Sequence, residues 1–393
     1  MKHTKFVIWI ALIAVLAMCL GACSNETPSS EVPSEAPVTV NLAEVLAPQR
    51  SQILKNGETL QLNLPQGIEV TVTSGNEKVA TVSESGLVTA VGKGLAIITV
   101  SCGEEVAYCG VLVDPSGSMI DVTKLTGNEV FTDLELYSGT EIRGMSVDAK
   151  NQIVYFSQGY GSNSYVPLNS EVLISKVQKK DDVWGASSWM RFSGSGKGSI
   201  CIDSDSRLWM ESNGDYIGYG KSISLVDWSD NVYGQDEFGQ TIVLQGIGSG
   251  MTVTADPENN MVMIYDRAAK CYKIYDREAL IAGDNAPEYV HAFACKSNQT
   301  PVAGEDDSQG RYNASIRGYA LYDGYLYQFS GSSSIYVSAF DMNGTLQYCH
   351  RLENLPEVDY YMPASISVSG GKIYLVFATG SADYNFANLL VFE

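Results

Sequence analysis

From residue 144 to its end the chain repeats one short pattern, and this repeat limits the folds open to it more than any other feature. Each copy begins with a small residue, continues with alternating apolar residues, turns at Asp, Asn or Gly, and ends in an apolar or aromatic run. Repeats of about 40–55 residues are typical of four-stranded antiparallel blades. We therefore predict a five-bladed β-propeller, whose repeats start at Gly144, Gly198, Gly250, Gly318 and Ala364.

The last repeat has room for only three strands after Ala364. A further strand-like run, EVFTDLELY at 129–137, precedes the first repeat and has no partner of its own. This run would complete the last blade as its fourth strand and cover an edge that would otherwise be exposed. We therefore predict a propeller over residues 128–393 that closes through 129–137.

The composition indicates an all-β protein. The 393 residues include 37 Gly and 23 Tyr, and the apolar stretches are short and alternating. No amphipathic helix pattern runs longer than about three turns. The formal net charge of −20 argues against a nucleic-acid partner, because binding to phosphates needs clustered Lys and Arg.

The N-terminus has the features of a secretion signal. A basic start is followed by the apolar run FVIWIALIAVLAM, which ends at Leu20-Gly21-Ala22-Cys23. This ending resembles the lipobox of bacterial lipoproteins, which implies that 1–22 are a lipoprotein signal peptide and that Cys23 carries lipid. The alternative is an ordinary signal peptide cut after Ala22. The Ser-, Pro- and Glu-rich residues 23–49 are predicted to be a disordered tether. The mature protein would be extracytoplasmic, anchored by lipid to the outer face of the bacterial cytoplasmic membrane, at the cell surface.

Residues 50–114 alternate between apolar and polar residues in short runs bounded by Gly, Asn, Ser or Pro. The segments SGNEKVATVS at 74–83, GLVTAV at 86–91 and GLAII at 94–98 resemble the group-2 bacterial immunoglobulin-like domain. The resemblance implies a small β-sandwich that serves as a spacer or as an adhesive module. The predicted fold class is therefore all-β, with a small immunoglobulin-like β-sandwich followed by a five-bladed β-propeller.

Six cysteines follow Cys23. Cys102 and Cys109 flank GEEVAY, and a four-residue turn at 104–107 would place them opposite each other in a hairpin. A disulfide between them is one interpretation, and two free thiols is the other. The remaining four cysteines lie in strand-like runs and are predicted to be buried thiols. Because no C-x-x-C spacing occurs, no structural zinc site is predicted.

The propeller repeats resemble a known family. GMSVD at 144–148, MRFSGSGKGS at 190–199, RGYA at 317–320 and IYLVFATG at 373–380 are similar to the helveticin J and teichoic acid biosynthesis protein C group. That resemblance implies five blades. The family tends to have Gln where this chain has Arg143 and Arg317, and His where it has Lys197, so its ligand cannot be carried over.

Cations precede three of the repeat glycines, at Arg143, Lys197 and Arg317. The first strand of each propeller blade lines the central channel, so these residues would form a ring at one mouth of it, together with Ser249 and Pro363. An arginine can form two parallel hydrogen bonds with a carboxylate or phosphate. We predict an anion-binding site there. The alternative is pairing of the cations with acidic neighbours, for which Glu141, Asp323 and Asp359 are candidates.

Recognisable catalytic chemistry is missing. His291 and His350 are isolated, and neither H-E-x-x-H nor G-x-S-x-G occurs. Asp148, Asp203 and Asp256 recur in register, but at hairpin turns, so we interpret them as turn formers. Neither a metal nor a cofactor is predicted.

These features together predict a non-enzymatic, lipid-anchored binding or adhesion protein of the cell envelope, which is expected to be monomeric. Its propeller would bind a cell-wall glycan, another anionic envelope polymer or a surface protein. Two alternatives are a secreted propeller hydrolase acting on acidic polysaccharide and a bacteriocin-like surface effector.

Overall fold

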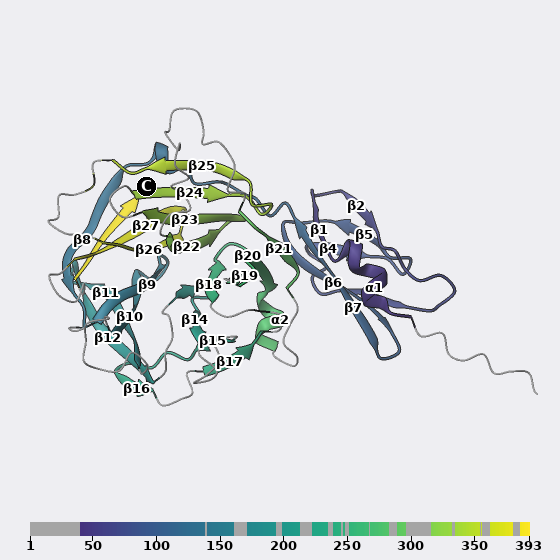
Figure 1. Ribbon diagram of the computed structural model, residues 1–393, viewed down its shortest axis with the longest axis horizontal. Coiled ribbons are helices and arrows are strands. Elements are labelled where there is room, and N and C mark those ends of the chain that lie inside the picture. The colour runs from purple at the N-terminus through teal and green to yellow at the C-terminus, as the bar shows by residue number, and fades with distance from the viewer. Residues whose placement is uncertain are drawn as a thin grey trace, which may run out of the picture. The chain divides into compact units, whose positions relative to one another are not determined.

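A computed structural model describes the protein over most of its length (Figure 1). The chain from residue 41 to 393 forms one compact unit. Only two short α-helices, α1 (Leu42–Leu46) and α2 (Arg277–Ala282), interrupt the strands of the described residues, so the all-β prediction is confirmed. The predicted signal peptide, Cys23 and most of the tether lie outside those residues. The described residues are 40–137, 140–160, 171–193, 199–212, 222–234, 239–244, 247, 251–266, 268–282, 289–295, 316–331, 335–353, 355, 362–379 and 386–393.

The first part of the chain is a sandwich of two sheets, in the orders β1-β7-β6-β3 and β2-β5-β4. Strand β1 runs parallel to β7, and the other paired strands are antiparallel. The alternating sequence places Leu95, Ile98 and Val111 in the core, where all three are fully buried. The strands are β1 (Ser51–Leu54), β2 (Thr59–Gln61), β3 (Thr71–Ser74), β4 (Ala80–Val82), β5 (Leu87–Ala90), β6 (Gly94–Cys102) and β7 (Glu105–Val113).

Of the two interpretations of Cys102 and Cys109, the disulfide is wrong and the free thiols are confirmed. Strands β6 and β7 turn through only two residues, and Gly103 adopts a φ of 60° that favours glycine. This tight turn pairs Cys102 with Glu105, so Cys109 lies opposite Ile98. Both thiols are free, and the Cys109 thiol donates to the carbonyl oxygen of Gln49 over 2.8 Å. A four-residue turn would have aligned the two cysteines, and the two-residue turn shifts the register away from that pairing.

Five sheets follow along the chain and are arranged around a common centre, with their first strands innermost (Figure 1). In four of them, the strands follow one another from the inner to the outer edge in chain order. The fifth has β8, from an earlier part of the chain, as its outer strand. The first sheet also gains β16, which lies parallel to β12. The sheets are β9-β10-β11-β12-β16, β13-β14-β15-β17, β18-β19-β20-β21, β22-β23-β24-β25 and β26-β27-β28-β8, called blades 1 to 5 below.

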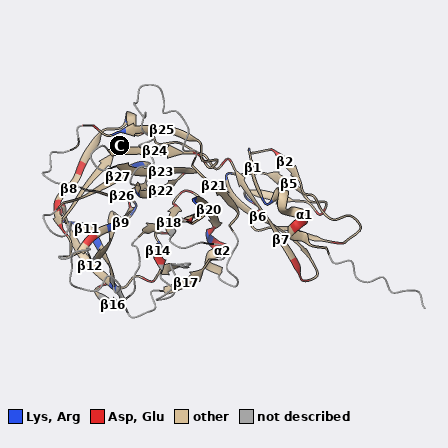
Figure 2. Ribbon diagram, in the orientation of Figure 1, with Lys and Arg blue, Asp and Glu red and all other residues tan. Residues whose placement is uncertain are grey.

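The blade strands are short, and most of their residues carry no charge (Figure 2). Their bounds are β8 (Gly127–Glu135), β9 (Thr140–Asp148), β10 (Ile153–Tyr160), β11 (Glu171–Lys180), β12 (Val183–Ser193), β13 (Ile200–Ile202), β14 (Leu208–Ser212), β15 (Ser222–Val226), β16 (Val232–Gly234), β17 (Gly239–Val243), β18 (Met251–Asp256), β19 (Met261–Asp266), β20 (Cys271–Asp276), β21 (His291–Phe293), β22 (Ile316–Tyr322), β23 (Tyr325–Gly331), β24 (Ile335–Phe340), β25 (Leu346–Arg351), β26 (Met362–Ser369), β27 (Lys372–Thr379) and β28 (Phe386–Phe392).

Blade 5 is completed by the strand that precedes blade 1, as the sequence predicts. Strand β8 pairs antiparallel with β28, with Phe131 opposite Leu389 and Gly127 opposite Phe392. The pairing shifts register on both sides of Leu389. At the shift, the side-chain oxygen of Asn388 accepts a hydrogen bond from the backbone N–H of Asp133 over 3.0 Å. The chain thus joins its first propeller strand to its last.

Hydroxyl side chains connect the inner strands of neighbouring blades. The N–H groups of Met145 and Val147 on β9, and of Ala149 just after it, donate to hydroxyls on β26. The acceptors are Ser365, Ser367 and Ser369, over 3.1, 3.0 and 3.3 Å. The alternation of β26 turns these serines toward blade 1, while Ile366 and Val368 face the core. The N–H groups along this edge of β9 face no neighbouring strand of their own sheet, and side-chain hydroxyls accept their hydrogen bonds instead.

The recurrent aspartates form the hairpin turns, as expected. Asp148 accepts from the backbone N–H of Asn151, Asp203 from that of Arg207, and Asp256 from that of Glu258. Asp256 also accepts from the N–H groups of Asp323 and Gly324 in blade 4, over 3.0 and 2.9 Å. These carboxylates hold turns and, in the case of Asp256, connect two blades.

The sandwich packs against blade 3. Leu95 and Leu112 belong to one apolar cluster with Met263 and Ile274, and all four are buried. The ring of His291 on β21 joins the two parts, because its Nδ1 lies 2.6 Å from the Ser51 hydroxyl and its Nε2 lies 2.7 Å from the Met342 carbonyl oxygen. A carbonyl oxygen only accepts, so Nε2 carries the proton and Nδ1 accepts from Ser51.

Candidate functional site

Between the described parts of the inner strands, which enclose a channel, lie two neighbouring cavities of about 460 and 300 Å³. Met145, Ile200 and Tyr319 line both of them, so the cavities lie next to each other along the channel. The larger one is bordered by the hairpin turns of the blades, and the smaller one by the beginnings of the inner strands. The two ends of the channel therefore present different side chains.

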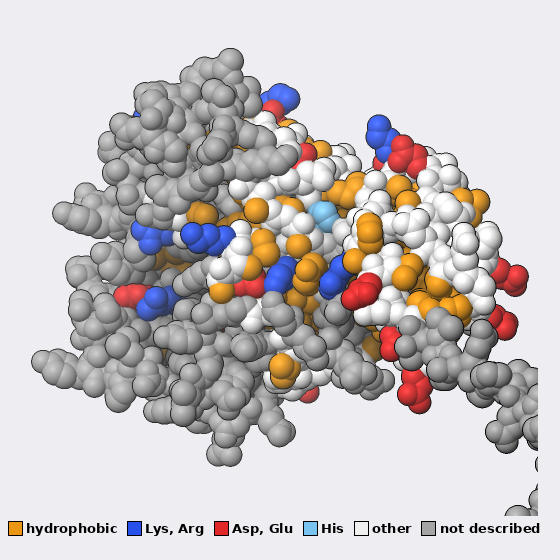
Figure 3. Space-filling view, turned by 45° about the vertical axis from the view of Figure 1, so that its right-hand side comes forward, with side chains coloured by type: hydrophobic (Ala, Val, Ile, Leu, Met, Phe, Trp, Pro, Cys, Tyr) orange, Lys and Arg blue, Asp and Glu red, His pale blue; other side chains and the backbone are white. Residues whose placement is uncertain are grey.

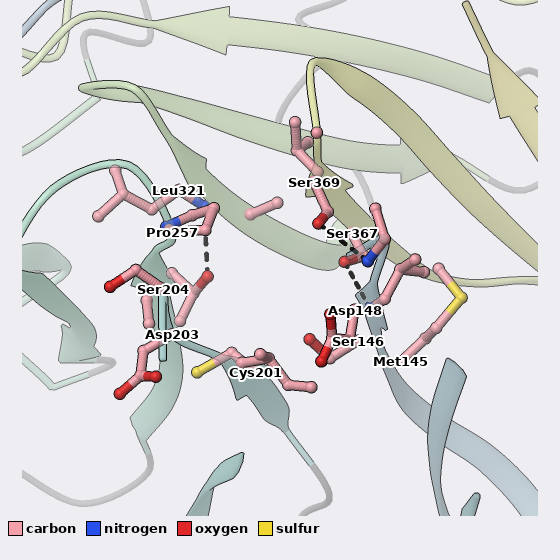
Figure 4. A pocket seen from close by; sticks show the side chains of 18 of the residues that line it. Met145, Ser146, Asp148, Cys201, Asp203, Ser204, Pro257, Leu321, Ser367 and Ser369 are labelled. Atoms are coloured by element: carbon pink, nitrogen blue, oxygen red, sulfur yellow. Dashed lines mark hydrogen bonds between the residues drawn. The ribbon is translucent and has the colours of Figure 1, made fainter. Parts of the chain in front are cut away.

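Hydroxyl and carboxylate groups line the larger cavity (Figure 4). Ser146, Ser367 and Ser369 contribute hydroxyls, and Asp148 and Asp203 contribute carboxylates. Both aspartates are engaged by their own hairpins. Asp203 additionally accepts from the ring nitrogen of Trp209 over 3.0 Å. Asp148 and Asp203 consequently serve the blade turns.

The smaller cavity contains two of the three predicted cations. Arg143 of β9 and Arg317 of β22 both line it, although they belong to blades 1 and 4. Lys197 lies outside the described residues, as does Ser249, and Pro363 is buried in β26. The shared position of the two arginines before a repeat glycine is thus matched by a shared cavity. We call this cavity, together with Arg143, Glu211, Tyr265, Arg317 and Tyr319, the channel mouth.

The two arginines differ in their partners. The Arg143 guanidinium forms an ion pair of 2.9 Å with Glu141 of its own strand, and their side chains are 41% and 22% exposed. For Arg143, the alternative to an anion site is therefore confirmed: this cation pairs with an acidic neighbour, Glu141. The Arg317 Nε donates to the carbonyl oxygen of Gly331 over 3.3 Å, which holds the side chain along blade 4.

Glu211 is a residue of the channel mouth that the sequence pattern missed. It lies on β14, its side chain is only 2% exposed, and it lines the cavity that contains the arginines. The hydroxyl of Ser199 donates to its carboxylate over 3.4 Å and accepts from the N–H of Val253. The sequence signal for Glu211 is an acidic residue directly after the apolar run LWM, at a position unrelated to the repeat glycines.

On the face drawn in Figure 3, basic and acidic side chains occur in small groups among uncharged ones. Among the described residues, no group of three or more His, Cys, Asp or Glu side chains is arranged to hold a metal ion. None of the helices described is long and apolar enough to cross a membrane.

The comparisons identify the first domain. The family model of the bacterial Ig-like domain (group 2) matches residues 46–109, a span that includes most of the sandwich. Among solved structures, a GH10 xylanase from termite gut that contains a bacterial Ig-like domain shares 23% identity over 24% of each chain, with a TM-score of 0.16. The chain therefore spans about a quarter of that structure. No curated protein matches the chain.

Similarities to the propeller are structural. RS223-β-xylosidase is 9% identical, with a TM-score of 0.41, over 65% of this chain and 93% of its own. The exo-β-1,3-galactanase of Phanerochaete chrysosporium is 10% identical, with a TM-score of 0.40, over 67% of this chain and 64% of its own. At such low identity these similarities concern the fold alone.

The prediction of a non-enzymatic protein is wrong. It rested on the absence of catalytic sequence motifs and on hairpin positions for the recurrent aspartates. The structures similar to this chain include two enzymes named for their action on glycosides, the xylosidase and the galactanase. Glycoside cleavage needs two positioned carboxyl groups rather than a sequence motif. Glu211 lines the cavity from the second strand of its blade. The hairpin aspartates, which were the carboxyl groups considered from the sequence, do not reveal its position.

Proposed function

We propose that this protein acts on an acidic carbohydrate outside the cell and binds it at the channel mouth. The observation that carries the proposal is the presence of Arg143 and Arg317 in one cavity of about 300 Å³. A guanidinium group matches the geometry of a carboxylate, sulfate or phosphate. In a chain with a net charge of −20, a cavity lined by two arginines and one described carboxylate, Glu211, would favour an anion more than most other surfaces do.

Arg317 is the principal anion-binding residue in this account. It lies at the beginning of an inner strand, and its Nε donates to the backbone carbonyl oxygen of Gly331. Arg143 contributes less, because Glu141 already neutralises part of its charge. Lys197 would add a third cation if it follows the same placement. Hydroxyl groups of Ser199, Thr252 and Ser365 line the same cavity and supply partners for sugar hydroxyls.

Hydrolysis of the bound carbohydrate is a second candidate function, and the burial of Glu211 favours it. A carboxyl group in a largely water-free site is suited to give a proton to a glycosidic oxygen. In this reaction Glu211 protonates the leaving oxygen as the bond to the anomeric carbon breaks. A water molecule attacks that carbon and gives its proton to a second carboxylate, and Glu141, the ion-pair partner of the cavity-lining Arg143, is the candidate for this role.

The location of the protein is part of the proposal. Cys23 would carry the lipid that holds the protein at the outer face of the cytoplasmic membrane, and the following tether would allow the propeller to reach envelope polymers or surface proteins. The resemblance of the propeller to the helveticin J and teichoic acid biosynthesis protein C group is consistent with an envelope role. The match to a bacterial Ig-like domain supports an extracellular setting.

One paired assay tests both candidates. Purified acidic polysaccharides and wall polymers are incubated with the wild-type chain, Glu211→Gln and Arg317→Gln, and retained polymer and new reducing ends are measured in the same samples. Binding should be lost in Arg317→Gln and kept in Glu211→Gln. Reducing ends that appear with the wild type and disappear in Glu211→Gln would establish hydrolysis. Equal retention by the wild type and Arg317→Gln would contradict the proposed site.

A further inference from the structure

Three tyrosines meet between blades 3 and 4, at the channel mouth. The ring centroids of Tyr265 and Tyr319 are 5.5 Å apart at an interplanar angle of 40°. Tyr272 lies behind them, 4.8 Å from Tyr265 and 5.5 Å from Tyr319. Tyr265 and Tyr319 line the cavity of the channel mouth, whereas Tyr272 is only 3% exposed. Two cavity-lining rings are therefore backed by a buried one.

The buried ring is held from several sides. The side-chain amide of Gln328 donates to the Tyr272 hydroxyl over 2.7 Å, and Phe293 stacks on the ring at 5.3 Å and 24°. Burial raises the pKa of Tyr272 well above its ordinary value, so the phenol stays neutral. Because Tyr272 is fixed by blades 3 and 4 together, the two rings in front of it rest on a rigid support.

We propose that Tyr265 and Tyr319 form an aromatic shelf on which the six-membered ring of a uronic acid stacks, while the carboxylate of that ring binds Arg317. This inference rests on the proposed function and names its substrate class. The face of an aromatic ring is electrically negative, and the C–H bonds on the face of a sugar ring point partial positive charge toward it. Arg317 precedes Tyr319 by two positions and lines the same cavity, so the shelf and the guanidinium act on one ligand.

The combination selects among anions. A polyol phosphate chain supplies the charge but has no flat face to cover the shelf. A neutral hexose supplies the face but has no anion for Arg317. A uronic acid supplies both on one ring. A cavity of about 300 Å³ has room for little more than one or two sugar rings, which favours recognition of an end or a single unit of the polymer.

Calorimetric titration of the full chain tests the shelf. The ligands are trigalacturonate, a glycerol phosphate oligomer, galactotriose and inorganic phosphate. The proteins are the wild type, Tyr319→Leu, and Tyr319→Phe as the matched control that keeps the ring. Trigalacturonate should bind the wild type most tightly. Tyr319→Leu should weaken it by roughly three- to tenfold and leave phosphate unchanged, and Tyr319→Phe should stay within about twofold of the wild type.

The outcomes separate the shelf from the site it rests on. If glycerol phosphate binds as tightly as trigalacturonate and Tyr319→Leu binds both like the wild type, the shelf is wrong and the anion site stands. If no anion binds, or if Arg317→Gln binds all of them unchanged, the proposed function and the shelf both fail. Should Tyr319→Leu unfold, Tyr265→Leu changes the shelf from blade 3 and must give the same selective loss.

Discussion

Arg143 and Arg317 line one cavity from two different blades, and both stand immediately before the glycine that opens a repeat. Residues at the same offset from a repeat glycine become neighbours in space because the inner strands surround a common channel. The two residues nonetheless differ in electrostatic state, since Glu141 pairs with Arg143 and the Arg317 guanidinium contacts a backbone carbonyl. This difference leads to distinct expectations for the two arginines.

Replacing Arg317 should remove most of the stabilisation that a bound anion gives. A ligand that binds only the folded state raises the melting temperature by mass action. Phosphate or sulfate should therefore raise the melting temperature of the wild type clearly, that of Arg143→Gln somewhat less, and that of Arg317→Gln least. Arg351→Gln, at the exposed end of β25, is the matched control and should behave like the wild type. An equal anion response in all four proteins would rule out the channel mouth as the anion site.

Removing the negative charge of Glu141 should strengthen anion binding. The Glu141–Arg143 pair is partly exposed, so its loss should cost little stability and leave Arg143 available to the ligand. We expect Glu141→Gln to bind trigalacturonate a few-fold more tightly in calorimetric titration. If Glu141 also accepts the proton of the attacking water, the same variant should release no reducing ends. Weaker binding by Glu141→Gln would show that the carboxylate orients Arg143 rather than competing with the ligand.

The contact between blades 5 and 1 should be sensitive to a single hydroxyl. Ser367→Ala leaves the buried N–H of Val147 without its acceptor, which should lower the free energy of unfolding by about 1–3 kcal/mol. Denaturant unfolding followed by fluorescence measures this change. Ser116→Ala, at an exposed position, should change it by less than about 0.5 kcal/mol. Equal stability of the two variants would mean that the hydroxyls of β26 do not hold the propeller closed.

Much of this fold can be predicted from the sequence, because it depends on regular patterns. The alternation of β26, SISVS, and the unpaired run at 129–137 both follow from the period of two in a strand and from the need to cover an edge. The register of a single hairpin is harder. The turn between Cys102 and Cys109 could contain two or four residues, and only the backbone geometry at Gly103 decides between them.

The candidate site is predictable only where it follows the repeat. Arg143 and Arg317 share an offset from a glycine, so ring closure brings them to one mouth. Tyr319 directly follows the repeat glycine Gly318, so its place is predictable in the same way, whereas Glu211 and Tyr265 share no such offset and reach the cavity from the second strands of their blades. Whether a strand residue points into a channel or into the space between blades depends on packing, which the sequence does not show directly.

His291 should make stability depend on pH near neutrality. Burial lowers its pKa from the ordinary value of 6.5, so the unfolded chain binds a proton more readily than the folded one. The contribution of His291 is complete above pH 6.5 and is lost as the pH falls from 6.5 toward the lowered pKa. His291→Gln should therefore be less stable at pH 8 but should lose less stability than the wild type between pH 7 and 5. Parallel pH profiles of unfolding free energy for the two proteins would contradict this role.

A structure of the protein with bound trigalacturonate tests the central claim most directly. The account predicts one sugar ring in the cavity at the channel mouth, with its carboxylate within hydrogen-bonding distance of the Arg317 guanidinium and its face against Tyr265 and Tyr319. Ligand bound on the sandwich, at the hairpin end of the channel beside Asp148 and Asp203, or on an outer blade surface would contradict it.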